Sequence, residues 1–194
     1  MLEALTLLDR MREVALEQHG FVTTQQAAEL GGSSALLAAM VRRGRLEHPA
    51  RGVYRVGQVP VTEYDGHMLA VLWTGFPEAC LSHDTALDVW DISDILPNQI
   101  HITVAAHRRI ERAIPSGYVI HYEDLAPGEV TWWEAIPTAT AAAAIRQCLD
   151  TGVPTYLIRQ ALERSARTGI VPAEQREQLS SIAASPGKHP GSQG

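Results

Sequence analysis

Five arginines between positions 42 and 55 are the residues of this sequence with the clearest chemical potential: Arg42, Arg43, Arg45, Arg51 and Arg55. A guanidinium is always charged and binds phosphate oxygens through a planar fork of donors. Residues 1–60 hold seven arginines against six acids, whereas residues 61–194 hold nine basic residues against sixteen acids. Because the whole chain has a net charge of −6, the cluster predicts one nucleic-acid-contacting module on an acidic body.

Three short helices are expected to position these arginines. The first is predicted over residues 2–18, where apolar residues recur at spacings of three and four. Thr23 and Gln26 have the spacing of a capping box, which opens the second helix. Ser33 can cap the third helix, and Gly44 can end it.

The third helix has the place of a recognition helix. Residues set about 100° apart around its axis put Leu36, Leu37, Met40 and Val41 on one face, which is expected to be buried. The predicted DNA-contacting positions are Ser33, Ser34, Ala35, Ala38, Arg42 and Arg43. Alanine reads base edges poorly, so most of the affinity is expected from phosphate contacts, and any specificity from groove shape, the wing tip or the spacing of two copies.

A β-hairpin is predicted after the third helix, from two alternating runs over residues 45–47 and 53–56 that are joined by a turn containing proline and glycine. Arg51 is expected at its tip, and Arg45 and Arg55 are also assigned to DNA contact, whereas Leu46 and Tyr54 are assigned to packing. Three helices and a hairpin predict a winged helix-turn-helix. A wing with merely solvated arginines remains an alternative.

The remainder of the chain predicts a second domain. Residues 57–62 resemble a linker, and residues 56–107 contain seven acids and no lysine or arginine, which suits a solvated acidic face or a basic protein partner. Helices are expected over 64–75, 86–90, 138–149, 154–168 and 172–183, and strands over 99–106, 117–123 and 130–136.

The predicted fold class is α+β, with an N-terminal winged helix-turn-helix followed by a mixed α/β domain that has a small sheet and C-terminal helices. The expected boundaries are 1–58 for the DNA-binding domain, 63–183 for the second domain, and 184–194 for a polar tail rich in proline and glycine that is expected to be disordered.

No catalytic residue, metal site or cofactor is predicted. Cys80 and His83 have ligand spacing, but a single pair is weak evidence for a structural zinc site. His83, Asp84 and His121 offer acid–base groups without a nucleophile motif, and the sequence has neither a P-loop nor a dinucleotide fingerprint. The two cysteines, Cys80 and Cys148, are expected to be buried free thiols.

The expected location is the cytoplasm. No run of about 18 apolar residues is present to span a membrane, and acidic residues interrupt the N-terminal apolar positions, so no signal peptide is predicted.

Several segments resemble a known family. Residues 20–27, 37–44 and 51–55 are similar to the N-terminal winged helix of the AbiEi family of bacterial antitoxins, and residues 81–87, 92–94 and 100–104 are similar to the start of its C-terminal antitoxin domain. The resemblance implies a protein that binds and represses its own promoter and counteracts a cognate nucleotidyltransferase-like toxin. One position departs from the family pattern, since Ala139 stands where an arginine is common.

The sequence is also compatible with three alternatives. In the first the chain is a free-standing regulator without a toxin, in the second a winged helix fused to a small nuclease, and in the third an antitoxin whose wing is vestigial. Nuclease sites commonly use a lysine beside their carboxylates. The only lysine of this chain, Lys188, lies in the predicted tail, which argues against the nuclease. The expected partners are operator DNA and the toxin, and the oligomeric state is open.

Overall fold

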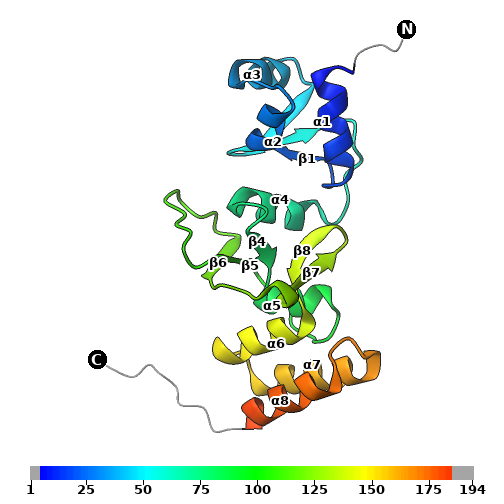
Figure 1. Ribbon diagram of the computed structural model, residues 1–194, viewed down its shortest axis with the longest axis vertical. Coiled ribbons are helices and arrows are strands. Elements are labelled where there is room, and N and C mark those ends of the chain that lie inside the picture. Colours follow the sequence, from blue (N-terminus) through cyan, green and yellow to red (C-terminus); the bar gives the residue numbers. More distant parts are fainter. Residues whose placement is uncertain (1–4, 185–194) are drawn as a thin grey trace.

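The computed structural model describes residues 5–184, which form three tiers along the long axis of the molecule (Figure 1). The winged helix forms one end, a five-stranded sheet with its covering helix forms the middle, and three helices form the other end. This arrangement confirms the predicted α+β fold class.

The N-terminal tier consists of α1 (Leu7–Leu16), β1 (Phe21–Thr23), α2 (Thr24–Glu29), α3 (Ser34–Arg42), β2 (Leu46–Ala50) and β3 (Val53–Val56). The capping box is confirmed: the Gln26 amide donates to Thr23 Oγ1 at 3.1 Å, and the Thr23 amide donates to Gln26 Oε1 at 2.9 Å. Ser33 also caps α3, since its hydroxyl oxygen accepts from the Leu36 amide at 3.2 Å.

Strand β1 was not predicted from the sequence. It pairs with β3, and the sheet order is β1-β3-β2 with antiparallel neighbours throughout. Three residues are too few to show a strand alternation, so only the pairing with β3 identifies this segment. The wing strand β3 is therefore the centre of a sheet rather than one edge of a two-stranded hairpin.

The rest of the described chain contains α4 (Asp65–Thr74), β4 (Ala79–Leu81), α5 (His83–Val89), β5 (Ile100–Val104), β6 (Tyr118–Tyr122), the short 3₁₀ turn η1 (Pro127–Glu129), β7 (Val130–Trp133), β8 (Ile136–Ala139), α6 (Ala141–Asp150), α7 (Thr155–Thr168) and α8 (Ala173–Ala184). The second sheet is mixed, with order β6-β5-β4-β8-β7. Its β4–β8 and β5–β6 pairs are parallel, and its β4–β5 and β7–β8 pairs are antiparallel.

Two sequence predictions for the second sheet were wrong. The single strand expected over 130–136 is a hairpin of β7 and β8, whose turn residues Glu134 and Ala135 have φ values of 45° and 61°. Proline lacks the amide hydrogen that a strand residue donates, so Pro137 argued against a strand at the position of β8. The three-residue central strand β4 was also missed, because it is too short to show a period.

The winged helix packs directly on the middle tier. Phe21 and Val53 belong to one buried cluster with Met68 and Trp73 of α4. His19 adds polar contacts, since its ring nitrogens lie 2.7 Å from the Glu134 carbonyl oxygen and 3.1 Å from Thr62 Oγ1. The segment predicted to be a linker therefore runs beside a packed interface, and the boundary between residues 58 and 63 remains a prediction.

The ends of the chain limit two further predictions. Residues 2–4 of the helix predicted over 2–18 and residues 185–194 of the predicted tail lie outside the described residues. Ala184, which was predicted to belong to the tail, is the last residue of α8. Among the described helices, none is both long and apolar enough to cross a membrane.

Candidate nucleic-acid interface

Helix α3 presents a mostly small, uncharged surface to solvent. Leu37 and Met40 are buried against α1, β1 and α2, as predicted. Leu36 was expected to be buried with them, but 40% of its surface is exposed. The neighbouring elements cover only a narrow strip of this nine-residue helix, so a residue at the edge of the predicted face reaches solvent.

The outward surface of α3 therefore carries one apolar side chain that the sequence reasoning missed. Leu36 joins the exposed predicted positions Ser33, Ser34, Ala35 and Ala38. An aliphatic side chain in a major groove can contact thymine methyl groups. This surface offers shape and apolar contact rather than base-specific hydrogen bonds.

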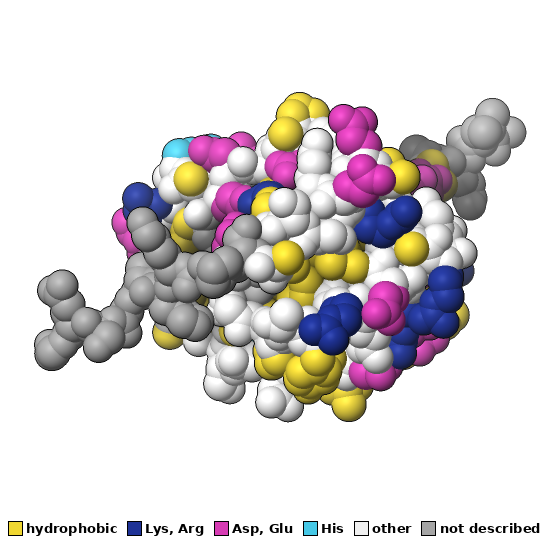
Figure 2. Space-filling view, turned by 90° about the horizontal axis from the view of Figure 1, so that it is seen from below, with side chains coloured by type: hydrophobic (Ala, Val, Ile, Leu, Met, Phe, Trp, Pro, Cys, Tyr) yellow, Lys and Arg dark blue, Asp and Glu magenta, His cyan; other side chains and the backbone are white. Residues whose placement is uncertain are grey.

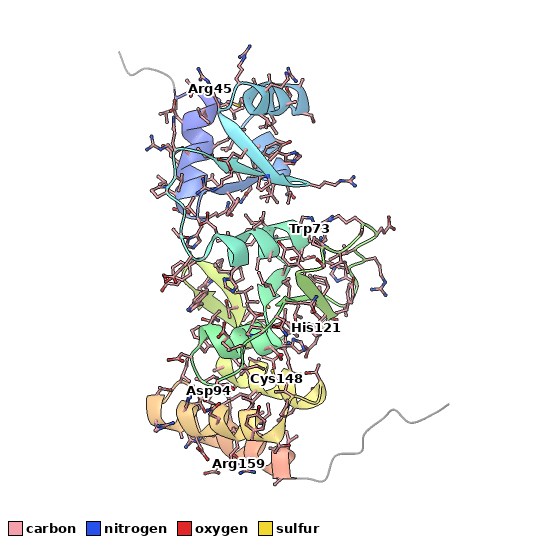
Figure 3. The ribbon with its side chains drawn as sticks, turned by 180° about the vertical axis from the view of Figure 1, so that it is seen from behind. Arg45, Trp73, Asp94, His121, Cys148 and Arg159 are labelled. Atoms are coloured by element: carbon pink, nitrogen blue, oxygen red, sulfur yellow. The ribbon has the colours of Figure 1, made fainter. Side chains whose placement is uncertain are left out.

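Four of the five predicted arginines are exposed on the winged helix. Arg42 and Arg43 end α3, Arg45 precedes β2, and Arg51 lies in the turn between β2 and β3. Among the described residues none of the four forms an ion pair with a carboxylate. Figure 3 places Arg45 at the end of the molecule farthest from α7. These guanidiniums are free to bind an anion.

The wing itself is well ordered by local contacts. Gly52 in its turn has a φ of 80°, a conformation that glycine adopts without strain, and its carbonyl oxygen accepts from the Thr24 amide at 2.9 Å. Leu46 is buried, and the Tyr54 ring stacks on the His48 ring with centroids 4.7 Å apart. The assignment of Leu46 and Tyr54 to packing is confirmed.

The assignment of Arg55 to phosphate contact requires correction. Arg55 is 7% exposed, and its Nη2 donates to the Val59 carbonyl oxygen at 3.0 Å and to Asp65 Oδ2 at 3.3 Å. Alternation along β3 directs Val53 and Arg55 toward the second tier and Tyr54 and Val56 toward the winged-helix core. Arg55 therefore joins the winged helix to α4 and is not available to DNA.

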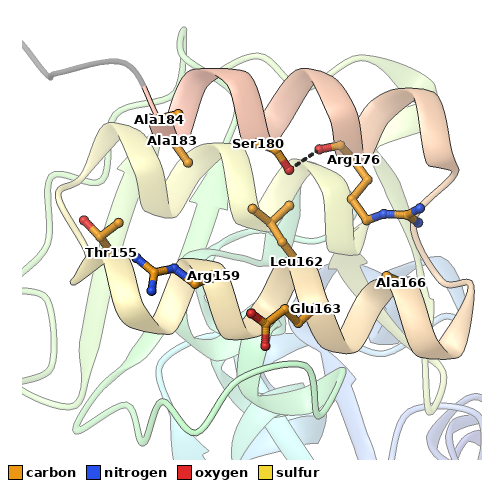
Figure 4. Close-up of a pocket in the computed structure, with 9 residues that line it drawn as sticks. All are labelled: Thr155, Arg159, Leu162, Glu163, Ala166, Arg176, Ser180, Ala183 and Ala184. Atoms are coloured by element: carbon orange, nitrogen blue, oxygen red, sulfur yellow. Dashed lines mark hydrogen bonds between the residues drawn. The ribbon is translucent and has the colours of Figure 1, made fainter.

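The end of the molecule opposite the wing differs in its charge pattern. Figure 2 shows this end, where arginines and acidic side chains are intermixed around exposed apolar surface. A groove of about 430 Å³ between α7 and α8 is lined by Leu162, Ala166 and Ala183 together with Arg159, Glu163 and Arg176 (Figure 4). Mixed charge of this kind does not favour a phosphate backbone.

A histidine cluster lies in the middle tier, remote from the wing. The rings of His83 and His121 stack with centroids 3.5 Å apart, and His121 Nε2 lies 3.2 Å from His101 Nδ1. His121 is labelled in Figure 3. Because the His83 and His121 rings are stacked, the lone pairs of their nitrogens lie in nearly parallel planes and do not converge on one point that a metal ion could occupy. Within residues 5–184, no group of three or more histidine, cysteine, aspartate and glutamate side chains is arranged to hold a metal ion.

The cluster makes stability sensitive to acid. Burial, then the neighbouring imidazoles of His121 and His101, lowers the pKa of His83 to about 3, and burial, then His101, lowers the pKa of His121 to about 4. An unfolded histidine has a pKa near 6.5. Between these values the unfolded chain binds more protons than the folded chain, so stability falls as the pH drops below about 6.5.

We expect the free energy of unfolding to decrease by roughly 3 kcal/mol from the cluster between about pH 7.5 and pH 4.5. This is less than the roughly 5 kcal/mol that the two full shifts would give over this range, because solvent screens the half-buried His121. Denaturant titrations at the two pH values measure it. His121→Asn should retain more of its stability at low pH than the wild type, whereas His107→Asn, which changes an exposed histidine, should behave as the wild type. Equal acid losses in all three proteins would contradict the assignment.

Both cysteines are buried and free, as predicted. Burial raises the pKa of Cys80 to about 12 and also raises the pKa of Cys148 above its usual range. Cys80 and His83 share no metal-binding group within the described residues. The pair is therefore part of the packing of β4 and α5.

Comparison with known proteins agrees with this geometry. The crystal structure of the RV2827C protein from Mycobacterium tuberculosis is similar in fold, with a TM-score of 0.53 and 15% sequence identity, over 93% of this chain and 74% of that chain. No curated protein sequence matches the chain. Residues 9–57 match the family described as "Transcriptional regulator, AbiEi antitoxin". The matched segment begins within α1, ends just after β3 and so covers most of the winged helix.

Proposed function

We propose that the protein binds the promoter DNA of its own operon through the winged helix and represses transcription from it. The observation that carries the proposal is the group of four exposed arginines, Arg42, Arg43, Arg45 and Arg51, which have no carboxylate partner among the described residues. They lie on the winged helix of a chain whose net charge is −6. Duplex DNA supplies the phosphates that such a local cluster binds.

In this proposal α3 enters the major groove. Ser33 and Ser34 lie at its N-terminal end, Ala35, Leu36 and Ala38 pass along the bases, and the arginines at its C-terminal end contact the backbone. Arg51 reaches phosphates or the minor groove from the wing tip. Small residues allow a close approach of the helix, so affinity comes mainly from phosphates.

We further propose that the C-terminal part of the chain acts as an antitoxin against a nucleotidyltransferase-like toxin. The description of the matched family as an antitoxin supports this role. Ala139, which stands in the place of a common family arginine, is fully buried, and its carbonyl oxygen accepts from Trp90 Nε1 at 2.9 Å. An arginine at this position would have to be accommodated in a packed core, so this chain uses that position for packing.

A binding assay tests the DNA role. Fluorescence anisotropy compares a labelled duplex from the region upstream of the protein's own gene with a scrambled duplex of equal length. Tighter binding to the upstream duplex is expected, with both affinities decreasing steeply as salt rises. Absence of binding to both duplexes at low salt would overturn the DNA role.

Co-expression tests the antitoxin role. The adjacent gene is induced with and without this protein, and growth and co-purification are scored. Growth should be rescued by the wild type and equally by an Arg42→Ala/Arg51→Ala variant, because the toxin-directed surface is proposed to lie outside the winged helix. Toxicity without any rescue would favour a free-standing regulator.

A further inference from the structure

The loop that joins β5 to β6 is the second concentration of arginine in the chain. Residues 105–117 contain Arg108, Arg109 and Arg112 against one acid, Glu111, and they follow a stretch over residues 56–107 without any lysine or arginine. The loop projects from the middle tier on the same side of the molecule as the wing (Figure 1). Its charge therefore adds to the side that presents Arg51.

Two of these arginines anchor the loop to the C-terminal end of α4. Arg108 donates from Nη2 to the Thr74 carbonyl oxygen at 3.3 Å and from Nη1 to the Gly75 carbonyl oxygen at 3.4 Å. Arg112 donates from Nη2 to the Trp73 carbonyl oxygen, and its guanidinium lies 4.2 Å from the centre of the Trp73 ring. The last carbonyls of a helix lack intrahelical partners and attract cations.

Close packing reinforces this anchor. A Cβ atom added at Gly75 would lie 2.2 Å from Arg108 Nη2, so the absence of a side chain there makes room for the guanidinium. Figure 3 labels Trp73, at the end of α4 that the loop contacts. The loop is thus held in place from its middle, and its remaining arginine is presented from a fixed support.

The loop and the wing share one buried cluster. Ala50, next to the wing tip, and Ile110, in the loop, both pack against the cluster that contains Trp73. Burial, followed by the positive charges of Arg51 and Arg108, lowers the pKa of Arg112. The Arg112 Nε atom is buried without a hydrogen-bond partner. The wing tip therefore lies close to Arg112 of the loop.

Carboxylates do not balance this group of cations. Glu78 pairs with Arg108 at 3.2 Å, whereas Arg109 is exposed and forms no ion pair with any carboxylate among the described residues. Arg109 Nη1 donates to the carbonyl oxygens of Ala106 and Arg108, and its guanidinium lies 5.8 Å from the centre of the Tyr122 ring. These contacts orient the side chain without neutralising its charge. Arg109 and Arg112 thus have no carboxylate partner within residues 5–184, and a polyanion would neutralise their charge.

We propose that the β5–β6 loop is a second contact with the DNA backbone, in which the exposed Arg109, on a loop that Arg108 and Arg112 anchor to α4, binds phosphates beyond the wing. The inference rests on the proposed DNA-binding role and extends it into the C-terminal part of the chain. The position of the loop on the side that carries the wing favours nucleic acid over an acidic protein, because a duplex bound at the wing presents further phosphates along this side. The forked guanidinium also matches phosphate geometry.

The test is a salt titration of binding to the labelled upstream duplex and to the scrambled duplex, with Arg109→Ala, Arg109→Lys and Arg51→Ala beside the wild type. Arg109→Ala should weaken binding to both duplexes about 5-fold and reduce the slope of log affinity against log salt by about 0.9, as the loss of one phosphate contact predicts. Arg109→Lys should recover most of the slope. Arg159→Ala, which removes the same charge from an exposed position on α7, should bind as the wild type.

The outcomes separate the two proposals. Normal binding by Arg109→Ala together with weakened binding by Arg51→Ala would overturn the loop contact and leave the winged-helix role standing. Equal losses in Arg109→Ala and Arg159→Ala would also overturn it, since the effect would then reflect net charge alone. Failure of the wild type to bind either duplex would overturn both proposals.

Discussion

An Arg42→Ala/Arg51→Ala variant is expected to bind the upstream duplex roughly 30- to 150-fold more weakly than the wild type at about 100 mM salt, because each charge-assisted phosphate contact contributes about 1–1.5 kcal/mol. The slope of log affinity against log salt should decrease by about 2, because two phosphate contacts and their released counterions are lost. The loss should be similar for scrambled DNA.

Arg42 and Arg51 belong to different elements of the winged helix. Arg42 lies at the end of α3 and Arg51 at the tip of the wing. The variant therefore removes one proposed phosphate contact from each of the two elements. Both side chains are exposed and have no carboxylate partner among residues 5–184. Their removal should leave the folded structure and its thermal stability nearly unchanged.

A charge-matched variant controls for this prediction. Arg159→Ala/Arg167→Ala removes two exposed arginines from α7, at the opposite end of the molecule. Its affinity should stay within about 2-fold of the wild type, because charges more than a Debye length of about 10 Å from the DNA are screened. If both double variants lost affinity to the same extent, the arginines at the wing end would have no special role.

The second large effect is expected from Asp65. Replacing it with alanine leaves the Arg55 guanidinium buried without a counter-charge, and it also removes the acceptor of the Thr62 amide (2.9 Å) and hydroxyl (2.7 Å). Breaking a buried pair by removing one partner costs about 3–5 kcal/mol. Since side-chain exposures are 9% for Arg55 and 15% for Asp65, we expect a loss of about 3 kcal/mol in the free energy of unfolding.

Urea denaturation of Asp65→Ala, Glu63→Ala and Arg55→Met/Asp65→Ala measures this coupling. Glu63 is an exposed acid two residues away, and its replacement should cost less than about 0.5 kcal/mol. The double variant should be more stable than Asp65→Ala, because it removes the uncompensated buried charge. A double variant less stable than Asp65→Ala would show that the pair itself is not what Asp65 supplies.

Arg55 also shows the limit of reasoning from charge along the chain. Its sequence neighbours, an exposed turn and a basic cluster, favoured DNA contact. Its actual role depends on Asp65 and on the pairing of β3 with β1, which places it between two packed layers. The acidic stretch over residues 56–107 is explained in part by the same effect, since Asp65, Glu78 and Asp94 form ion pairs with arginines elsewhere in the chain.

The local features of the winged helix were predictable because they depend on neighbours within a few residues. The capping box of Thr23 and Gln26, the cap at Ser33 and the turn at Gly52 each follow from the chemistry of one short segment. The shortest strands were not predictable, because β1 and β4 have three residues each and are defined only by their partners.

The sequence by itself determined the α+β class and the order of winged helix and mixed sheet. It also determined which arginines lie at the end of α3 and at the tip of the wing, because periodicity, caps and turn residues act locally. Only the tertiary structure decided which of those arginines face solvent. It exposed Leu36, buried Arg55 against Asp65, and brought Arg109 to the side of the wing from more than fifty residues away. Burial and electrostatic proximity depend on packing between distant segments, and no local pattern encodes them.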